Sequence, residues 1–220
     1  WSFRVFVREL LQLYKAFSCG LPSSPIPDCP MQMADYAIWE RQWAESEEAA
    51  QKLEYWTTAL QDCPASLELP LDRRRPAVPT FQGASFRMEL PSRLCRLIRV
   101  LCRQEKATLY SLLLTAFCTL LHRYASQDVV LVGCAVANRR SRQLEQLLGM
   151  VVANVVLRCQ VPGEATFPDV LERTQHVLLE AQEHSLVPFD RVVAALGGER
   201  DLSRNPLFQV MFNLHDAPLP

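Results

Sequence analysis

The sequence predicts an α/β domain in which helices pack on a mixed sheet. Two almost wholly apolar runs, residues 129–137 and 150–157, have the composition of strands buried on both faces, although a short buried helix would look similar. Amphipathic segments with helical spacing precede and follow these runs. The resulting order, helices first and then strands separated by helices, is typical of a sheet with helices packed on it.

The composition narrows the class of protein. The chain has 220 residues, of which 49% are hydrophobic and 21% are charged, and its net charge of −1 gives no argument for nucleic-acid binding. Eight cysteines occur without any C-x-x-C spacing, so we expect free thiols in a reducing, cytoplasmic compartment and no metal site. No run approaches the ~18–20 apolar residues of a membrane span. The chain begins at Trp1, without a methionine, and we expect it to be part of a longer polypeptide.

Helical periodicity dominates the first 60 residues. Residues 2–19 carry apolar side chains at helical spacing, with Ser2 suited to the N-cap and Gly20 ending the helix. Four prolines between residues 22 and 30 predict an extended connector. Residues 32–60 then return to a helical pattern with aromatic packing residues.

A proline-rich linker follows these helices. It contains four prolines between residues 64 and 79 and an arginine triplet at 73–75, which could bind an anion but is more commonly a solvated connector. The predicted organisation is therefore a helical part at 1–62, a linker at 63–80 and a second unit at 81–220.

The second unit is predicted to contain both strands and helices. Residues 85–90 alternate in polarity, as a half-exposed strand does, and Thr108 is suited to cap a helix. The two apolar runs of the first paragraph follow as central strands. The remaining elements are, in chain order, helices at 91–101, 108–124, 167–183 and 189–196 and a final strand at 208–214.

The residues alone give no complete active site. Phosphate loops, dinucleotide fingerprints, zinc-protease motifs and nucleophile elbows are all missing from the sequence, and none of the four histidines is paired at a ligand-like spacing. Asn154 is the one polar residue in the second apolar run. A polar amide in a buried strand needs a hydrogen-bond partner or a functional role, and a satisfied core amide is the commoner case.

Four stretches in order resemble motifs of the condensation domain of nonribosomal peptide synthetases, part of the chloramphenicol-acetyltransferase-like group. Residues 34–39 resemble Y-x-D-Y-A-x-W, residues 149–158 resemble G-x-F-V-N-T-x-x-x-R, residues 184–190 resemble H-Q-D-x-P-F-E, and residues 200–207 match R-D-x-S-R-N-P-L. The motif residues in the first, third and fourth stretches are Asp35, Tyr36, Trp39, His184, Pro188, Phe189, Arg200, Asp201, Ser203, Arg204, Asn205 and Pro206.

The resemblance implies two related lobes with a tunnel between them. Two carrier domains would insert their phosphopantetheine arms into this tunnel, and the acceptor amine would attack the donor thioester to form an amide. The chain would bind no cofactor itself. Its expected partners are the carrier domains, an adjacent adenylation domain and the N-terminal lobe. This chain would supply the C-terminal lobe and the last helices of the N-terminal lobe, and we expect the Phe3–Phe6–Leu10 face of the first helix to be exposed where that lobe would pack.

The sequence also departs from the family pattern. The catalytic histidine of the family lies in H-H-x-x-x-D-G, which would fall upstream of Trp1, so no catalytic residue is assigned within this chain. Tunnel candidates are Arg139, for which a structural ion pair is the alternative, together with Gly149, Ala153 and Asn154.

Two motif positions differ in ways that leave the function open. Ala153-Asn154 replaces Asn-Thr, and a one-residue displacement in a strand turns a side chain to the other face. Ser185-Leu186 replaces Gln-Asp. A non-catalytic module that docks carrier or partner domains, or an epimerising relative, therefore stays open beside the condensation reading.

Overall fold

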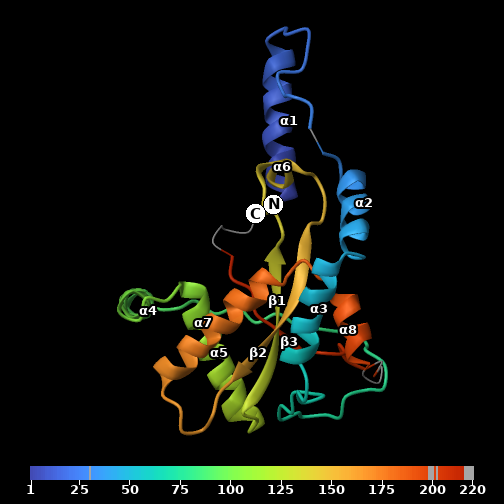
Figure 1. The fold of residues 1–220 in the computed structure, drawn as a ribbon. Coiled ribbons are helices and arrows are strands. Elements are labelled where there is room, and N and C mark those ends of the chain that lie inside the picture. Colours follow the sequence, from blue (N-terminus) through green and yellow to red (C-terminus); the bar gives the residue numbers. More distant parts are fainter. Residues whose placement is uncertain (30, 198–200, 202, 216–220) are drawn as a thin grey trace.

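The computed structural model describes residues 1–29, 31–197, 201 and 203–215. Three helices come first, and a mixture of helices and strands follows (Figure 1). The elements are α1 (Ser2–Ser18), α2 (Met33–Trp43), α3 (Glu47–Ala59), α4 (Ser92–Gln104), α5 (Leu109–Ala125), β1 (Val129–Ala137), α6 (Arg142–Gln146), β2 (Val152–Gln160), α7 (Phe167–Glu183), α8 (Phe189–Leu196) and β3 (Val210–Met211).

The described strands form a mixed sheet in the order β2-β1-β3. β1 pairs antiparallel with β2 along its whole length, from Val129↔Gln160 to Ala137↔Val152. It pairs parallel with β3 through Val132↔Val210 and Gly133↔Met211. The predicted mixed sheet with packed helices is therefore confirmed, and β1 is its central strand.

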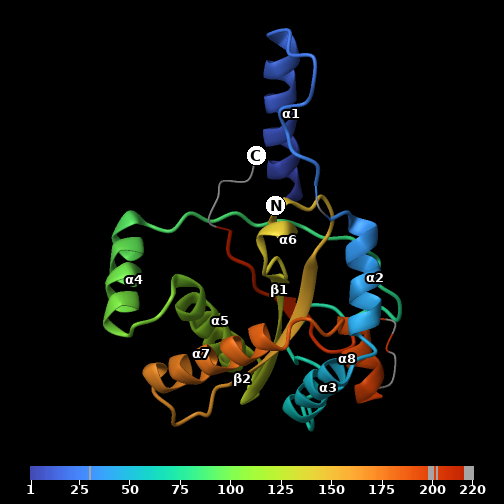
Figure 2. The same ribbon diagram turned by 45° about the horizontal axis from the view of Figure 1, so that its top comes forward.

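Helices cover both faces of this sheet. α5 and α7 pack on one face, with α4 outside α5, while α3 and α8 lie on the other (Figures 1 and 2). The buried core joins β1 and β2 to helices on both sides, and it includes Trp56 and Leu60 of α3. α3 thus packs with the strands, although the chain division at 62/63 and 80/81 stays a prediction.

Three predicted elements need correction. Residues 85–90 form no strand, and Phe86 and Met88 are 92% and 71% exposed; alternation in polarity is a weak signal when no neighbouring strand pairs with the segment. The helix expected at 32–60 is two helices, because the Ser46 hydroxyl accepts the Ala49 N–H and caps a new one. The final strand pairs only at Val210–Met211.

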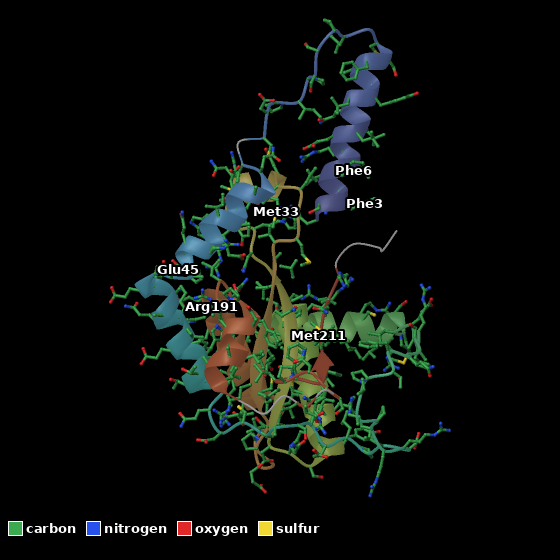
Figure 3. The ribbon with its side chains drawn as sticks, turned by 90° about the vertical axis from the view of Figure 1, so that its right-hand side faces the viewer. Phe3, Phe6, Met33, Glu45, Arg191 and Met211 are labelled. Carbon is green, nitrogen blue, oxygen red and sulfur yellow. The ribbon has the colours of Figure 1, made fainter. Side chains whose placement is uncertain are left out.

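α1 extends away from the rest of the molecule (Figure 2). Its apolar side chains face solvent, as expected, with Phe3, Phe6 and Leu10 between 50% and 66% exposed; Figure 3 labels the two phenylalanines. Within the described residues, no helix combines the length and apolar character needed to cross a membrane.

Candidate functional site

The segment after β1 is organised by the buried guanidinium of Arg139. It donates hydrogen bonds to the carbonyl oxygens of Leu147 at 2.7 Å and Gly149 at 2.8 Å, and also to that of Leu144. It also donates to the Ser2 hydroxyl at 3.0 Å. Burial lowers the pKa of this guanidinium. These acceptors are backbone and hydroxyl oxygens, so Arg139 holds the loop by hydrogen bonds, and the structure places no carboxylate of a described residue against it.

The start of α1 is fastened to this same loop. The Ser2 hydroxyl donates to the Gly149 carbonyl at 2.7 Å and accepts the Gly149 N–H at 3.1 Å. The Trp1 indole N–H donates to the Glu145 carbonyl at 2.8 Å, and the Arg139 guanidinium lies 5.8 Å from the Trp1 ring centre. Ser2 therefore does not cap α1 as predicted: Trp1 holds the N-cap position, and the Ser2 hydroxyl joins the helix to the loop.

Gly149 also brings α2 against the loop. A Cβ at Gly149 would overlap the Met33 sulfur and come within 3.1 Å of the Met33 Cγ. Met33 packs on the small buried cluster of Tyr36, Leu147 and Val151. The first two motif stretches thus meet at this point, and Figure 3 shows Met33 at the end of α2 that faces the loop.

Gly149→Ala is expected to lower the free energy of unfolding by about 1 kcal/mol, because the added methyl must displace the flexible Met33 side chain. Denaturant unfolding followed by tryptophan fluorescence measures this. Gly163→Ala is the matched control, since a Cβ there would meet no atom within 4 Å. Equal stability of the Gly149 and Gly163 variants would contradict the close approach.

The other residues of the first motif have structural contacts. The Asp35 carboxylate accepts the Gln32 N–H at 2.8 Å in a capping box at the start of α2. Trp39 is 43% exposed and its ring lies between those of Tyr36 and Trp43, with centroid distances of 5.6 and 6.4 Å. Burial, and secondarily the Glu40 carboxylate that accepts the Tyr36 hydroxyl, raises the pKa of Tyr36 to about 12.

Tyr36 should make stability depend on pH in alkali. Because its pKa is raised in the folded state, its stabilising effect is complete below the unfolded pKa of 10.0 and is lost as pH rises towards 12. Between about pH 9 and pH 11.5, we expect wild type to lose about 2 kcal/mol more than Tyr36→Phe. Denaturant unfolding at a series of pH values measures this difference. Parallel curves for the two proteins would contradict it.

β2 presents Ala153 and Asn154 opposite the end of β1. Ala153 pairs with Val136, and Asn154 pairs with Ala135. Asn154 is exposed while Val155 next to it is buried, so the interpretation of Asn154 as a core amide is wrong. Further along β2, Arg158 donates to the Ala59 carbonyl at 3.1 Å and ties the strand to the end of α3.

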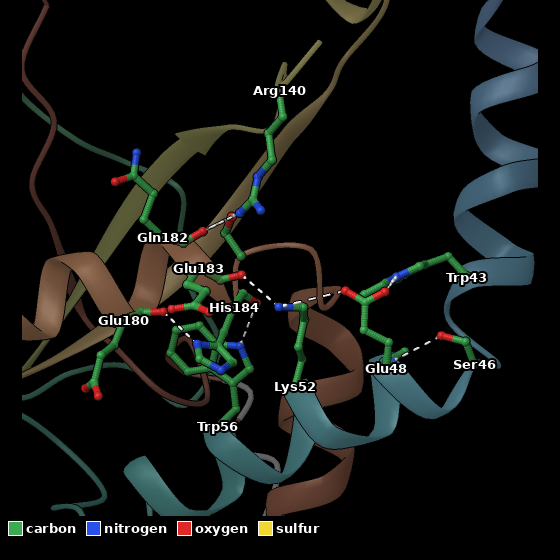
Figure 4. Close-up of polar contacts among 12 residues, drawn as sticks. Trp43, Ser46, Glu48, Lys52, Trp56, Arg140, Glu180, Gln182, Glu183 and His184 are labelled. Carbon is green, nitrogen blue, oxygen red and sulfur yellow. Dashed lines mark hydrogen bonds and ion pairs between the residues drawn. The ribbon is translucent and has the colours of Figure 1, made fainter.

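The third motif stretch connects α7 to α8. His184 ends α7, its Nδ1 donates to the Glu180 carbonyl at 2.8 Å, and its ring stacks on Tyr55 at 3.9 Å. The Trp56 indole donates to the His184 carbonyl at 3.0 Å (Figure 4). Both a ring nitrogen and the ring face are engaged in packing, which suits a structural role for His184.

The residues after His184 connect α7 to the loop that follows β1. The Ser185 side chain is wholly buried; its hydroxyl donates to the Asn138 side-chain oxygen at 2.8 Å, and its carbonyl accepts the Asn138 amide at 2.9 Å. Pro188 occupies the N-cap of α8, and the Phe189 ring packs 5.6 Å from that of Phe208.

The fourth motif stretch is a turn that leads to β3. Arg200 lies outside the described residues. The Asp201 carboxylate accepts the Ser203 N–H at 2.8 Å and pairs with Arg204 at 2.7 Å, and these contacts, the Ser203 bonds first, lower the pKa of Asp201. The Asn205 side chain accepts the Leu207 N–H at 3.2 Å, and exposed Pro206 lies between them. The turn delivers Phe208 onto β1.

A pocket of about 510 Å³ lies between α5, α7 and the second half of β1. The sequence motifs did not indicate it, because its walls come mainly from Tyr110, Cys134, Leu178, Leu179 and Gln182, which fall outside all four stretches. The one available signal was the small-residue end of β1, Ala135 to Ala137, where little side-chain volume fills the space.

The family model of the condensation domain matches residues 1–219. The chain belongs to the condensation-domain family. A linear gramicidin synthase of Brevibacillus parabrevis is 40% identical over 219 residues, which are 100% of this chain and 4% of that synthase. Malpinin synthetase of Mortierella alpina is 37% identical over 212 residues, which are 96% of this chain and 3% of that synthetase. The chain thus spans a small part of the length of these relatives.

Solved condensation-type structures share the fold. The X-domain from teicoplanin biosynthesis, in its complex with OxyB, is 28% identical with a TM-score of 0.86 and covers 100% of this chain and 50% of that one. The four-domain nonribosomal peptide synthetase AB3403, bound to AMP and glycine, is 26% identical with a TM-score of 0.79, covering 93% of this chain and 15% of that one. The predicted family and its chloramphenicol-acetyltransferase-like α/β fold are confirmed.

Proposed function

We propose that this chain is the C-terminal lobe, with the last helices of the N-terminal lobe, of a peptide-bond-forming condensation domain. The match of the family model over residues 1–219 carries this proposal. In the reaction, the amine of a carrier-bound acceptor attacks the carbonyl of a carrier-bound donor thioester; a C–N bond forms, the C–S bond breaks and the donor thiol leaves. Phosphopantetheine on the carrier domains supplies both thiols, and adenylation domains load them.

The contribution of this chain is positioning. Arg139 and Ser2 fix the 141–149 loop against the start of α1, where the family's histidine motif would precede Trp1. That histidine, near neutral in pKa, would accept the proton of the attacking amine. His184 is not a candidate for this role, since its Nδ1 donates to a backbone carbonyl and its ring stacks on Tyr55. Gly149, Ala153 and Asn154 are proposed to line the tunnel.

The test uses the full-length polypeptide that contains this chain, with donor and acceptor carriers loaded separately. We expect a longer, amide-linked product on the acceptor carrier, detected by intact-protein mass spectrometry. Absence of product with both carriers shown to be loaded would overturn the enzymatic proposal. Exchange of the α-hydrogen of a carrier-bound residue in deuterated water, without amide formation, would instead indicate the epimerising alternative.

The second candidate is a non-catalytic docking module. The observation that favours it is the similarity to an X-domain whose structure was solved in complex with OxyB. The substitution of Ser185-Leu186 for the family's Gln-Asp also fits a module free of catalytic constraint. Tight binding of a carrier or partner domain by calorimetry, together with no amide formation, would support docking over catalysis. An upstream histidine motif lacking its histidines would support it as well.

A further inference from the structure

The pocket between α5, α7, β1 and β2 has the size of a ligand site. Its volume of about 510 Å³ falls within the range of roughly 300–1,000 Å³ typical of small-molecule pockets. One wall is α7, with Leu178, Leu179 and Gln182, and the opposite wall is the start of α5 with Tyr110. The pocket is therefore large enough to receive an aliphatic or aromatic side chain.

The chemistry of its walls is uncharged. Among the described residues, no aspartate, glutamate, lysine, arginine or histidine lines the pocket. Several polar groups of the lining already have partners. The Tyr110 hydroxyl lies 2.7 Å from the Cys134 sulfur and 3.3 Å from the Phe212 carbonyl, and the Ser111 hydroxyl donates to the Thr108 carbonyl at 3.0 Å.

These contacts also fix the ionisation of the pocket walls. Burial, and secondarily the contact with Cys134, raises the pKa of Tyr110, and burial raises the pKa of Cys134, so both stay neutral at physiological pH. An ionised ligand group placed here would lose its hydration and gain no opposite charge. The pocket thus favours uncharged, apolar groups.

The position of the pocket connects it to the proposed site. Ala135, Val136 and Ala137 line it, and Ala137 leads directly through Asn138 to Arg139. The Ala135 N–H donates to the Asn213 side chain at 3.3 Å, which places the end of the chain's last described segment at the same edge, where Leu214 joins the lining. A group bound in the pocket would therefore lie beside the end of β1 that carries the loop of the proposed site.

We infer that this pocket receives the uncharged, apolar side chain of an aminoacyl or peptidyl substrate, and so selects against charged residues. The inference rests on the proposed function, because it identifies the bound group as part of a carrier-borne substrate. The substrate class it names is a residue with an aliphatic or aromatic side chain. A glycine substrate, which has no side chain, would gain nothing from the pocket.

The test is ligand binding by the full-length polypeptide that contains this chain. The probes are N-acetyl-phenylalanine amide, N-acetyl-leucine amide and N-acetyl-glycine amide, with the glutamate and lysine analogues as charged probes, and dissociation constants come from calorimetry or NMR titration. We expect the phenylalanine and leucine probes to bind at least about tenfold more tightly than the glycine and glutamate probes, since tenfold corresponds to burial of one or two methylene groups.

Leu179→Glu supplies the decisive variant. Leu179 lines the pocket but is 68% exposed, and glutamate is a good helix former, so the variant should fold. It should weaken the phenylalanine and leucine probes about tenfold and strengthen the lysine probe. Leu120→Glu is the matched control: Leu120 is an exposed leucine on α5 outside the lining, and its variant should bind like wild type. Ala137→Phe, which adds volume at the strand end, should weaken all side-chain-bearing probes.

The outcomes separate this inference from the proposed function. Equal affinity for the phenylalanine, glycine and glutamate probes, or equal effects of Leu179→Glu and Leu120→Glu, would overturn the pocket assignment even if amide formation is observed. Selective binding that Leu179→Glu removes, in a protein that forms no amide, would support the pocket chemistry and overturn the catalytic proposal. In an active protein, Leu179→Glu should reduce condensation of carrier-bound phenylalanine about tenfold and leave carrier-bound glycine unchanged.

Discussion

Replacing Arg139 by alanine is expected to lower the free energy of unfolding by about 3–5 kcal/mol. The guanidinium donates to three loop carbonyls and to the Ser2 hydroxyl, and its removal leaves partly buried oxygens without donors and a cavity beneath Trp1. Arg139→Lys should recover little of this loss, because a single ammonium group cannot reproduce the planar fork of donors. Denaturant unfolding followed by tryptophan fluorescence and circular dichroism measures both variants.

The neighbouring arginine provides the control. Arg140 is exposed, and its guanidinium donates to the Ser185 hydroxyl at 3.0 Å and to the Gln182 carbonyl (Figure 4 shows the latter contact). Arg140→Ala should cost about 1 kcal/mol. If Arg139→Ala proves no more destabilising than Arg140→Ala, Arg139 does not hold the loop, and its role lies with a ligand or another part of the protein.

Gly133→Ala is expected to lower the free energy of unfolding by about 2–3 kcal/mol. Gly133 lies in the middle of β1, and a Cβ there would come within 2.6–2.7 Å of atoms of the buried Phe208 ring. A rigid ring in a packed core cannot move aside as a flexible side chain can, so the cost should exceed that of Gly149→Ala. Thermal or denaturant unfolding measures the loss.

A double variant tests whether the ring is the cause. Phe208→Leu shortens the side chain over Gly133, so Gly133→Ala in that background should cost about 1 kcal/mol less than it does alone. Strict additivity of the two substitutions would show that the destabilisation arises from the strand itself and not from the contact with Phe208.

The fold could be predicted where burial and periodicity agree. β1 and β2 carry apolar runs that only a sheet interior accommodates, and α5 and α7 carry caps and helical periodicity that are both realised. Residues 85–90 failed because a strand depends on a partner strand, which local alternation does not report. Asn154 failed because the end of β2 leaves the protein interior, although its neighbours are apolar.

The candidate site could be predicted only in part. The motif resemblance identified Tyr36, Arg139 and Gly149, and the structure brings the segments carrying them together. It could not show that the Arg139 guanidinium is used on backbone carbonyls, since the residues that accept its hydrogen bonds are defined by loop geometry. The pocket walls were missed because α5 and α7 contribute them with ordinary core-type residues.

The parallel pairing of β3 with β1 has a consequence for the order of folding. β1 and β2 are close in sequence and can pair early, whereas the contact between Ala135 and Asn213 spans 78 residues. Contacts of such long sequence separation form late, because a long loop must close first. During synthesis, the β1–β2 pair leaves the ribosome before β3 exists. Phe208 and Leu214 therefore join the strand last, and a nascent chain acquires its complete pocket only when almost all of these 220 residues have been made.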